Sequence, residues 1–301
     1  MKNEYRGAVL GAAAGDALGM PYETSPPAFG KSMTKGFKKA PRNHPNASLP
    51  AGGYTDDTQI MLACAELLVS GNFTPENYAS KLQRLHENKK LRFPDGTVVT
   101  ACRHMSSKKE NFGCNSTTSG CIPLGLPFAL AFHDIVEMSE KLVEACAVTH
   151  TNPGAHAAAI SFATLIRATL DGDEKPLHEA QKNAFLEDHN LGLKTGEALR
   201  IAREDISLES SVSVIGNDVS VYQTLPMAYY LIQKFGDDPD LMYLAAGVGG
   251  NTDTIGFICG SWFGAQYGAS AIDEDLILGL ENRENLETIA DRLYMRYGTK
   301  N

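Results

Sequence analysis

Apolar residues recur along most of this chain at the three- and four-residue spacing of amphipathic α-helices. The segment 55–70 shows this clearly. Ile60, Cys64 and Leu68 share one of its faces, and a glycine follows its last turn. The same spacing predicts further helices over 4–19, 74–90, a pair within 123–148 led by Pro123 and by Ser139, 154–170, 178–188, 193–205, 220–235, 239–247, 252–269 and 284–296.

Polar stretches and weak strand signals complete this pattern. Residues 22–50 are rich in Pro, Ser, Lys and Asn and are expected to form a long loop, either a lid over a site or a plain connector. Residues 91–121 are expected to be irregular, with a turn at "FPDGT". The β-branched runs at 97–99 and 212–215 are short. The sequence therefore predicts an all-α fold in a single domain over 1–301.

Two of the predicted helices carry a glycine at every fourth position: Gly7, Gly11, Gly15 and Gly19 in one, and Gly256, Gly260, Gly264 and Gly268 in the other. This interval places the glycines on one helix face. Each glycine inside a helix costs about 1 kcal/mol relative to alanine, so eight cost about 8 kcal/mol. Close helix–helix approach offsets such a cost, because small residues let backbones draw near. We predict that these helices pack through their glycine faces, against each other or a shared neighbour.

Composition excludes several classes of partner. The chain has 301 residues, 43% of them hydrophobic, and a formal net charge of −9. Nucleic acid and anionic membrane both require clustered Lys and Arg, so neither is expected as a partner. No uninterrupted apolar run is long enough to span a membrane, and Glu4 and Asp16 argue against an N-terminal signal peptide. Six cysteines without a CxxC pair predict buried free thiols in a cytoplasmic protein.

Two similar acidic segments, "GGYTDDTQIM" (52–61) and "GGNTDTIGFI" (249–258), lie at predicted helix entrances far apart in the chain. Each combines candidate N-cap residues with carboxylates in the first helical turn: Thr55 with Asp56 and Asp57, and Asn251 or Thr252 with Asp253. Two ordinary caps would account for these residues. A hard divalent cation would account for them equally well, because it prefers carboxylate, hydroxyl and carbonyl oxygens.

Two further observations bear on the chemistry of these entrances. Neither segment contains His or Cys, so zinc is disfavoured as the cation. Asp16 lies on the first glycine-bearing helix, where a buried acid requires a partner. We expect it to form a buried polar contact at a helix entrance rather than to bind metal.

Five blocks in order over roughly residues 5–270 resemble the ADP-ribosylglycohydrolase family: "GDALGMPYE" (15–23), "GGYTDDTQIM" (52–61), "VTHTNPGAHAA" (148–158), "GNDVSVYQTLPMAYYL" (216–231) and "GGNTDTIGFICG" (249–260). That family includes the dinitrogenase-reductase-activating glycohydrolase, the ADP-ribosyl-acceptor hydrolases and the jellyfish J1 crystallins. The resemblance implies an all-α fold and a hydrolase that cleaves the glycosidic bond between ADP-ribose and an acceptor.

The resemblance also implies two bound divalent cations, Mg²⁺ or Mn²⁺, and a set of site residues. The implied metal ligands are Thr55, Asp56, Asp57, Asn251, Asp253 and Thr254. The implied catalytic residues are Glu23, Asp56 and Asp57. The implied substrate-binding residues are His150, near the distal ribose, with Ser119 and Gly120, where the family carries a Gly-rich phosphate-contacting loop that is shorter and less glycine-rich here.

One departure and several alternatives accompany this resemblance. Many members have Asp where this chain has Asn251, so one metal is expected to bind more weakly or with altered selectivity. The implied partner is an ADP-ribosylated protein or an ADP-ribosyl small molecule. A hydrolase of a small nucleoside-type substrate, and a non-catalytic crystallin-like or toxin-neutralising protein, remain as alternatives. We expect four aromatic residues to lie in the core: Tyr222, Tyr229, Tyr230 and Trp262.

Overall fold

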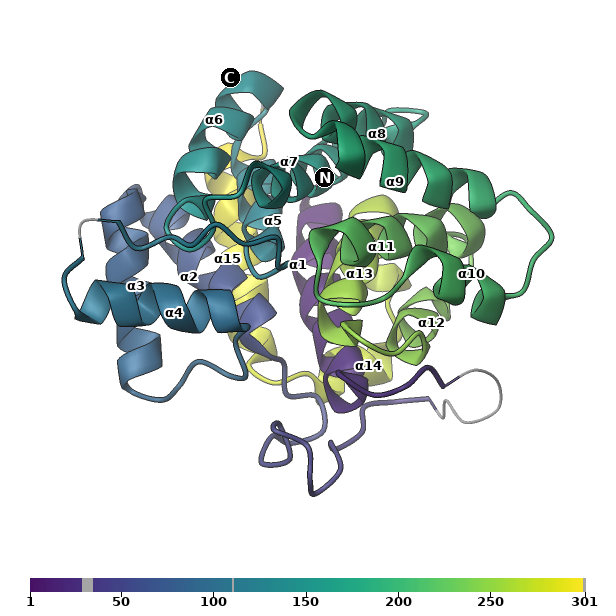
Figure 1. Cartoon of the computed structure of the whole chain (residues 1–301), viewed down its shortest axis with the longest axis horizontal. Coiled ribbons are helices and arrows are strands. Elements are labelled where there is room, and N and C mark those ends of the chain that lie inside the picture. Colours follow the sequence, from purple (N-terminus) through teal and green to yellow (C-terminus); the bar gives the residue numbers. More distant parts are fainter. Residues whose placement is uncertain (29–34, 110, 300–301) are drawn as a thin grey trace.

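α-Helices form nearly all the regular structure of this protein (Figure 1). The computed structural model describes residues 1–28, 35–109 and 111–299. Their helices are α1 (Lys2–Gly19), α2 (Asp56–Ser70), α3 (Pro75–Glu87), α4 (Gly96–Ser106), α5 (Gly125–Ala131), α6 (Ile135–Cys146), α7 (Pro153–Asp171), α8 (Pro176–Glu187), α9 (His189–Ile201), α10 (Leu208–Ile215), α11 (Val221–Phe235), α12 (Leu241–Gly247), α13 (Thr252–Tyr267), α14 (Glu274–Gly279) and α15 (Arg283–Tyr297), with 3-10 turns η1 (Met20–Tyr22), η2 (Ile122–Leu124) and η3 (Ala269–Ala271).

The all-α prediction is confirmed. Within the described ranges there is no strand, and β-type pairing is limited to two isolated bridges. Most predicted helices are present with ends shifted by a few residues. For example, α6 begins at Ile135, ahead of the predicted Ser139, because Asp134 accepts a hydrogen bond from the amide of Glu137 and so caps the helix.

The prediction that residues 91–121 are irregular is wrong for α4. Asp95 caps this helix by accepting hydrogen bonds from the amides of Thr97 and Val98. Its core-facing side is formed by Val98, Ala101, Cys102 and Met105. The β-branched runs at 97–99 and 212–215 lie inside α4 and α10. In α4, burial of Thr97 and Val98 on one helical face outweighs their β-propensity. Neither α10 nor α14 was expected from the sequence pattern.

The long loop predicted over 22–50 contains no α-helix in its described part, and it runs below the helices between α1 and α2 in Figure 1. Residues 29–34 lie outside the described residues. The role of the 22–50 loop as a lid stays a prediction.

The glycine faces of α1 and α13 pack against each other, as the sequence predicted. A Cβ added at a glycine of either helix would lie less than 3.0 Å from backbone of the other, in the antiparallel pairs Gly7–Gly264, Gly11–Gly260 and Gly15–Gly256. The outermost glycines differ, since Gly19 faces the carbonyl of Thr252 and Gly268 faces the side chain of Asn3. The backbones of α1 and α13 are therefore in direct contact, near the centre of the molecule in Figure 1.

Buried apolar side chains from most of the helices form one hydrophobic core. The predicted free thiols are confirmed, with five buried and Cys114 half-buried. Tyr229, Tyr230 and Trp262 are buried in this core, whereas Tyr222 is only partly buried against it. Among the helices that the structure describes, none is both long enough and apolar enough to cross a membrane.

Candidate active site

Asp16 of α1 holds the entrance of α2. Its Oδ1 accepts a hydrogen bond from the amide of Thr55 at 2.9 Å, and its Oδ2 accepts from the amide and hydroxyl of Thr58 at 3.1 and 2.6 Å. The prediction of a buried polar contact for Asp16 is therefore confirmed. Thr55 stands at the N-cap position, but its side chain caps nothing, so the expectation that Thr55 itself caps the helix is wrong.

The two acidic helix entrances meet in space. The hydroxyl of Thr55 donates a hydrogen bond to Oδ2 of Asp253 at 3.3 Å. This contact follows from the glycine pairing, because antiparallel α1 and α13 bring Gly19 beside Thr252, whose hydroxyl donates to the Gly19 carbonyl at 2.8 Å. Asp16 lies one turn earlier on α1, and its hydrogen bonds to Thr55 and Thr58 hold the start of α2 beside the start of α13.

Four carboxylates crowd together where these entrances meet. Glu23, Asp56, Asp57 and Asp253 are exposed by only 9%, 5%, 3% and 4%. Burial raises the pKa of Asp57, and the charge of Asp253 raises it further. Burial and then the neighbouring Asp57 likewise raise the pKa of Asp56. The four groups therefore cannot all ionise without a compensating positive charge.

The long loop after η1 holds Glu23 in this cluster. The side-chain amide of Asn46 donates to Oε2 of Glu23 at 3.4 Å, and the ring Nε2 of His44 lies 3.0 Å from the Glu23 carbonyl. Burial, then the charges of Asp253 and Asp57, raise the pKa of Glu23. Glu23 is thus a buried carboxyl with a high affinity for a proton, fixed by a loop rather than by a helix.

Asn251 occupies the N-cap position of α13, but no side chain caps this helix. The expectation that Asn251 or Thr252 caps it is therefore wrong. The Asn251 amide instead donates to the hydroxyls of Ser119 and Thr224, both at 2.9 Å. This orientation turns the amide oxygen of Asn251 away from those hydroxyls. Asn251 therefore ties the second acidic motif to the segment that contains Ser119.

A cleft of about 570 Å³ opens over the carboxylate cluster. Its walls include most of the predicted site residues: Glu23, Asp56, Asp57, Ser119, Gly120, Asn251, Asp253 and Thr254. Thr55 and His150 are fully buried and lie behind the wall. The roles proposed for all these residues stay predictions, but the geometry brings the first and second motifs to one cleft.

Asp95 lines the same cleft and was missed by the sequence reasoning. Its Oδ2 accepts a hydrogen bond from the amide of Gly120 at 3.2 Å and lies 3.7 Å from Nε2 of His150. Burial works to raise the pKa of Asp95, but the contact with His150 and the amide of Val98 outweigh it and lower the pKa to about 2. Asp95 is therefore an ionised carboxylate in the cleft wall, and His150 contacts it from behind.

Signals for Asp95 were present in the sequence. An Asp followed by the spacing of Val98, Ala101, Cys102 and Met105 is the pattern of a capped amphipathic helix. Because "FPDGT" was interpreted as a turn, Asp95 was not recognised as the N-cap of a helix that begins there. Phe93 and Asp218 also line the cleft, and no pattern in the sequence singled them out.

The residues of the cluster fit a hard divalent cation. Oδ2 of Asp57 is buried and has no hydrogen-bond partner in the described structure, and such an atom is normally paired. The remaining donors are carboxylate, hydroxyl and amide oxygens, which suit Mg²⁺ or Mn²⁺. Among the described residues, no three His, Cys, Asp or Glu side chains form a preformed metal cage. Any cation must therefore also draw on hydroxyls, amide oxygen or water.

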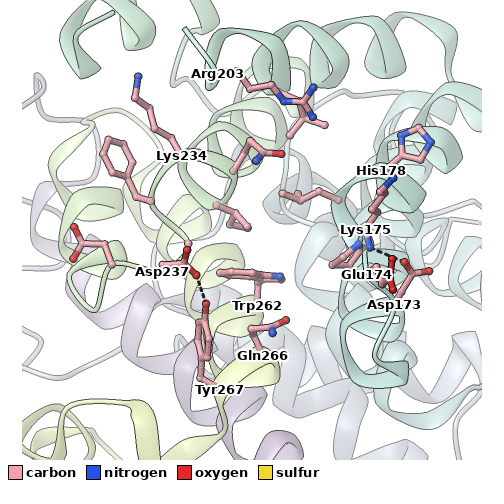
Figure 2. A pocket seen from close by; sticks show the side chains of 18 residues that line it. Asp173, Glu174, Lys175, His178, Arg203, Lys234, Asp237, Trp262, Gln266 and Tyr267 are labelled. Carbon is pink, nitrogen blue, oxygen red and sulfur yellow. Dashed lines mark hydrogen bonds between the residues drawn. The ribbon is translucent and has the colours of Figure 1, made fainter. Parts of the chain in front are cut away.

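A larger cavity of about 1130 Å³ lies elsewhere, and it shares no lining residue with the acidic cleft. Figure 2 shows residues that line it, among them Lys234, Arg203, Lys175 and Trp262. The hydroxyl of Tyr267 donates to Asp237 across one side of this cavity. It contains none of the predicted site residues, so size alone does not mark the candidate active site.

The chain is similar over its whole length to members of one protein family. A family model described as ADP-ribosylglycohydrolase matches residues 1–301. An uncharacterized protein of Archaeoglobus fulgidus is 33% identical over 305 residues, covering 98% of this chain and 97% of that protein. The ADP-ribosylhydrolase ARH3 of Homo sapiens is 22% identical and covers 97% of this chain and 93% of its own length.

Two further matches extend this result. The ADP-ribosylarginine hydrolase Tri1 of Pseudomonas putida is 24% identical, covering 97% of this chain and 78% of that protein. A solved structure titled as an ADP-ribosylglycohydrolase-related protein complex superposes with a TM-score of 0.75 at 26% identity, covering 98% of both chains. Relatives of this fold therefore match nearly the whole length of the chain.

Proposed function

This chain belongs to the ADP-ribosylglycohydrolase family, and we propose that it cleaves the glycosidic bond between ADP-ribose and an acceptor, with two divalent cations in the acidic cleft. The acceptor is a modified protein side chain or a small molecule. The observation that carries the proposal is the unpartnered, buried Oδ2 of Asp57 beside Asp56, Asp253 and Glu23. A crowded, buried group of carboxylates is unfavourable unless positive charge is bound there.

The residues that would hold the cations are Thr55, Asp56, Asp57, Asn251, Asp253 and Thr254. Asn251 replaces a carboxylate by an amide, so we expect one cation to bind more weakly than the other. When bound, such cations supply positive charge to the cluster and acidify water in contact with them.

The chain's own groups would then perform the proton transfer. Burial and the charges of Asp253 and Asp57 raise the pKa of Glu23, and bound cations would lower it again, so that Glu23, at the edge of the cleft, could accept a proton from the attacking water. Water would bond to the ribose C1″ as the bond from C1″ to the acceptor breaks, and the proton taken by Glu23 would pass to the departing acceptor. The transition state resembles an oxocarbenium ion, whose positive charge the carboxylates of Asp56 and Asp57 would stabilise. The burial of the cluster strengthens these interactions by excluding water.

The direct test is release of ADP-ribose from ADP-ribosylated proteins in the presence of Mg²⁺ or Mn²⁺. We expect turnover that stops with a chelator and falls at least a hundredfold in Glu23→Gln and Asp57→Asn. Asp134→Asn is the matched control, because Asp134 caps α6 outside the cleft and Asn is an equally good N-cap. Turnover that is unchanged by the chelator, or equal in all variants, would refute the proposal.

A further inference from the structure

The backbone donors at the start of α2 are paired with other parts of the chain. Two of them donate to Asp16, as described above, and the amide of Asp56 donates to the carbonyl of Arg92 at 3.1 Å. A helix commonly uses the side chain of its own N-cap residue for this purpose. Because these donors are already paired, the carboxylates of Asp56 and Asp57 are not needed to cap α2.

Arg92 contacts this first turn at several points. Its guanidinium donates to the carbonyl of Tyr54 at 2.8 Å and lies over the Tyr54 ring, 5.2 Å from the ring centroid. Its amide donates to the side-chain oxygen of Gln59 at 2.9 Å. Together with the bond from the Asp56 amide, these contacts fix the backbone before, at and after the two adjacent carboxylates.

The guanidinium of Arg92 also joins this turn to the C-terminal part of the chain. It donates to both carboxylate oxygens of Glu281, at 2.6 and 2.8 Å. The amide of Glu281 donates to the carbonyl of Gly52 at 3.0 Å, and a Cβ added at Gly52 would lie less than 3.0 Å from the carbonyl oxygen of Gly279. The segment between α14 and α15 is therefore packed against the backbone of the first acidic motif (52–61).

Two residues beside this ion pair have an unusual backbone. Phe93 follows Arg92 at φ 48°, and Asn282 follows Glu281 at φ 52°. The left-handed region is uncommon for residues other than glycine, and a bulky side chain such as Phe is an outlier there. Such residues persist only where surrounding contacts fix them, and they cluster at functional sites. The ion pair supplies a fixing contact next to both of them.

We infer that Arg92 is a positioning residue for the cation site, and that its ion pair with Glu281 holds the first acidic motif in the orientation that cation binding requires. The inference rests on the proposed function in that the cations are those proposed for the acidic cleft. It extends that function to residues 279–282, which do not line the cleft. Contacts behind metal ligands typically change metal affinity by about tenfold to a hundredfold, because they fix the orientation of the ligands.

Calorimetric titration of the full chain with Mn²⁺ tests the inference. We expect Arg92→Gln to bind Mn²⁺ about tenfold to a hundredfold more weakly than the wild-type chain, and Glu281→Gln to lose a similar amount. The variant with both substitutions should lose no more than the larger single loss, because the two side chains act as one pair. The electron paramagnetic resonance spectrum of bound Mn²⁺ should also change in Arg92→Gln, since the ligands are held differently.

Arg6→Gln is the matched control. Arg6 donates to both carboxylate oxygens of Asp291, in an ion pair of the same two-bond geometry between α1 and α15, and neither residue lines the cleft. We expect this variant to keep the wild-type Mn²⁺ affinity and spectrum, although it also loses an ion pair. Circular dichroism verifies that each variant is folded at the titration temperature. If Arg92→Gln is not folded, Glu281→Gln decides, because it keeps the bonds from Arg92 to Tyr54 and Gln59.

Each result decides the inference. Wild-type Mn²⁺ affinity in the folded Arg92 and Glu281 variants would overturn it, and so would additive losses, an equal loss in Arg6→Gln or the absence of binding by the wild-type chain. Turnover of ADP-ribosylated protein in the same preparations keeps the two proposals apart. If the affinities change as expected and no ADP-ribose is released, the hydrolase proposal fails and the positioning role of Arg92 stands. If ADP-ribose is released while the variants bind Mn²⁺ as the wild type does, the reverse holds.

Discussion

The close packing of α1 against α13 predicts that a single methyl group at Gly11 destabilises the protein. A Cβ there would lie less than 3.0 Å from the carbonyl oxygen of Gly260, whereas carbon–oxygen contacts between packed backbones are about 3.3 to 3.6 Å. The helices must therefore separate by on the order of 1 Å, and such a gap forfeits about a quarter to a half of the dispersion energy along the contact.

The net effect follows from two opposing terms. Gly11→Ala gains about 1 kcal/mol of helix propensity, but overpacking against backbone costs more, and we expect a net loss of about 2 to 4 kcal/mol in the free energy of unfolding. For a chain of this size the melting temperature should fall by roughly 2 °C per kcal/mol, or about 4 to 8 °C. Thermal unfolding followed by circular dichroism measures this shift.

Gly196→Ala in α9 is the matched control. A Cβ at Gly196 would have as its nearest neighbour the flexible amide of Gln181, at 3.3 Å, which can move aside. We expect this variant to melt at or above the wild-type temperature, because the helix-propensity gain is unopposed. If Gly11→Ala also melts at or above the wild-type temperature, the glycine faces are not required for packing and the reasoning is refuted.

Three further predictions concern polar contacts. Asp16→Ala leaves the donors of Thr55 and Thr58 unpaired in the core, so we expect the free energy of unfolding in a urea titration to fall by about 2 to 5 kcal/mol. A smaller loss would mean that water replaces the carboxylate. Arg6 lowers the pKa of Asp291 in the folded protein to about 2, below the unfolded value of about 4. The ionised Asp291 therefore stabilises the folded protein above about pH 4, and this stabilisation is lost as the pH falls toward 2. The stability difference between wild type and Asp291→Asn should therefore be present at neutral pH and shrink below about pH 4, and a constant difference would contradict the assignment. Asn251→Asp adds a carboxylate to the proposed cation site, so Mn²⁺ should bind about tenfold more tightly by calorimetry, and weaker binding would show that the amide contacts to Ser119 matter more than charge.

The sequence predicted the parts of the fold that depend on regular spacing. Apolar residues three and four apart located α1, α2, α7 and α13, and the four-residue glycine interval predicted that α1 and α13 meet. Asp16 was recognised as a buried contact because a carboxylate on a buried helix needs donors. These inferences succeed because local periodicity determines which face of a helix is buried.

The cleft was only partly predictable for a physical reason. The two acidic motifs could be recognised because they resemble each other. Asp95 and Phe93 reach the cleft only through the way in which a distant segment of the chain folds. The β-branched run at 97–99 suggested no helix, although the spacing from Val98 to Met105 fits one. The contacts from Asp95 to Gly120 and His150 join segments whose proximity no local pattern encodes.

The pairing of α1 with α13 has a consequence for how the protein is made. α1 leaves the ribosome well before α13, so its glycine face has no partner until residues 252–267 have been synthesised. Until then α1 exposes bare backbone along one side, and the acidic residues of the cleft stay apart. We expect nascent chains of this protein to depend on protection by chaperones, and to gain their cleft only after α13 has been synthesised.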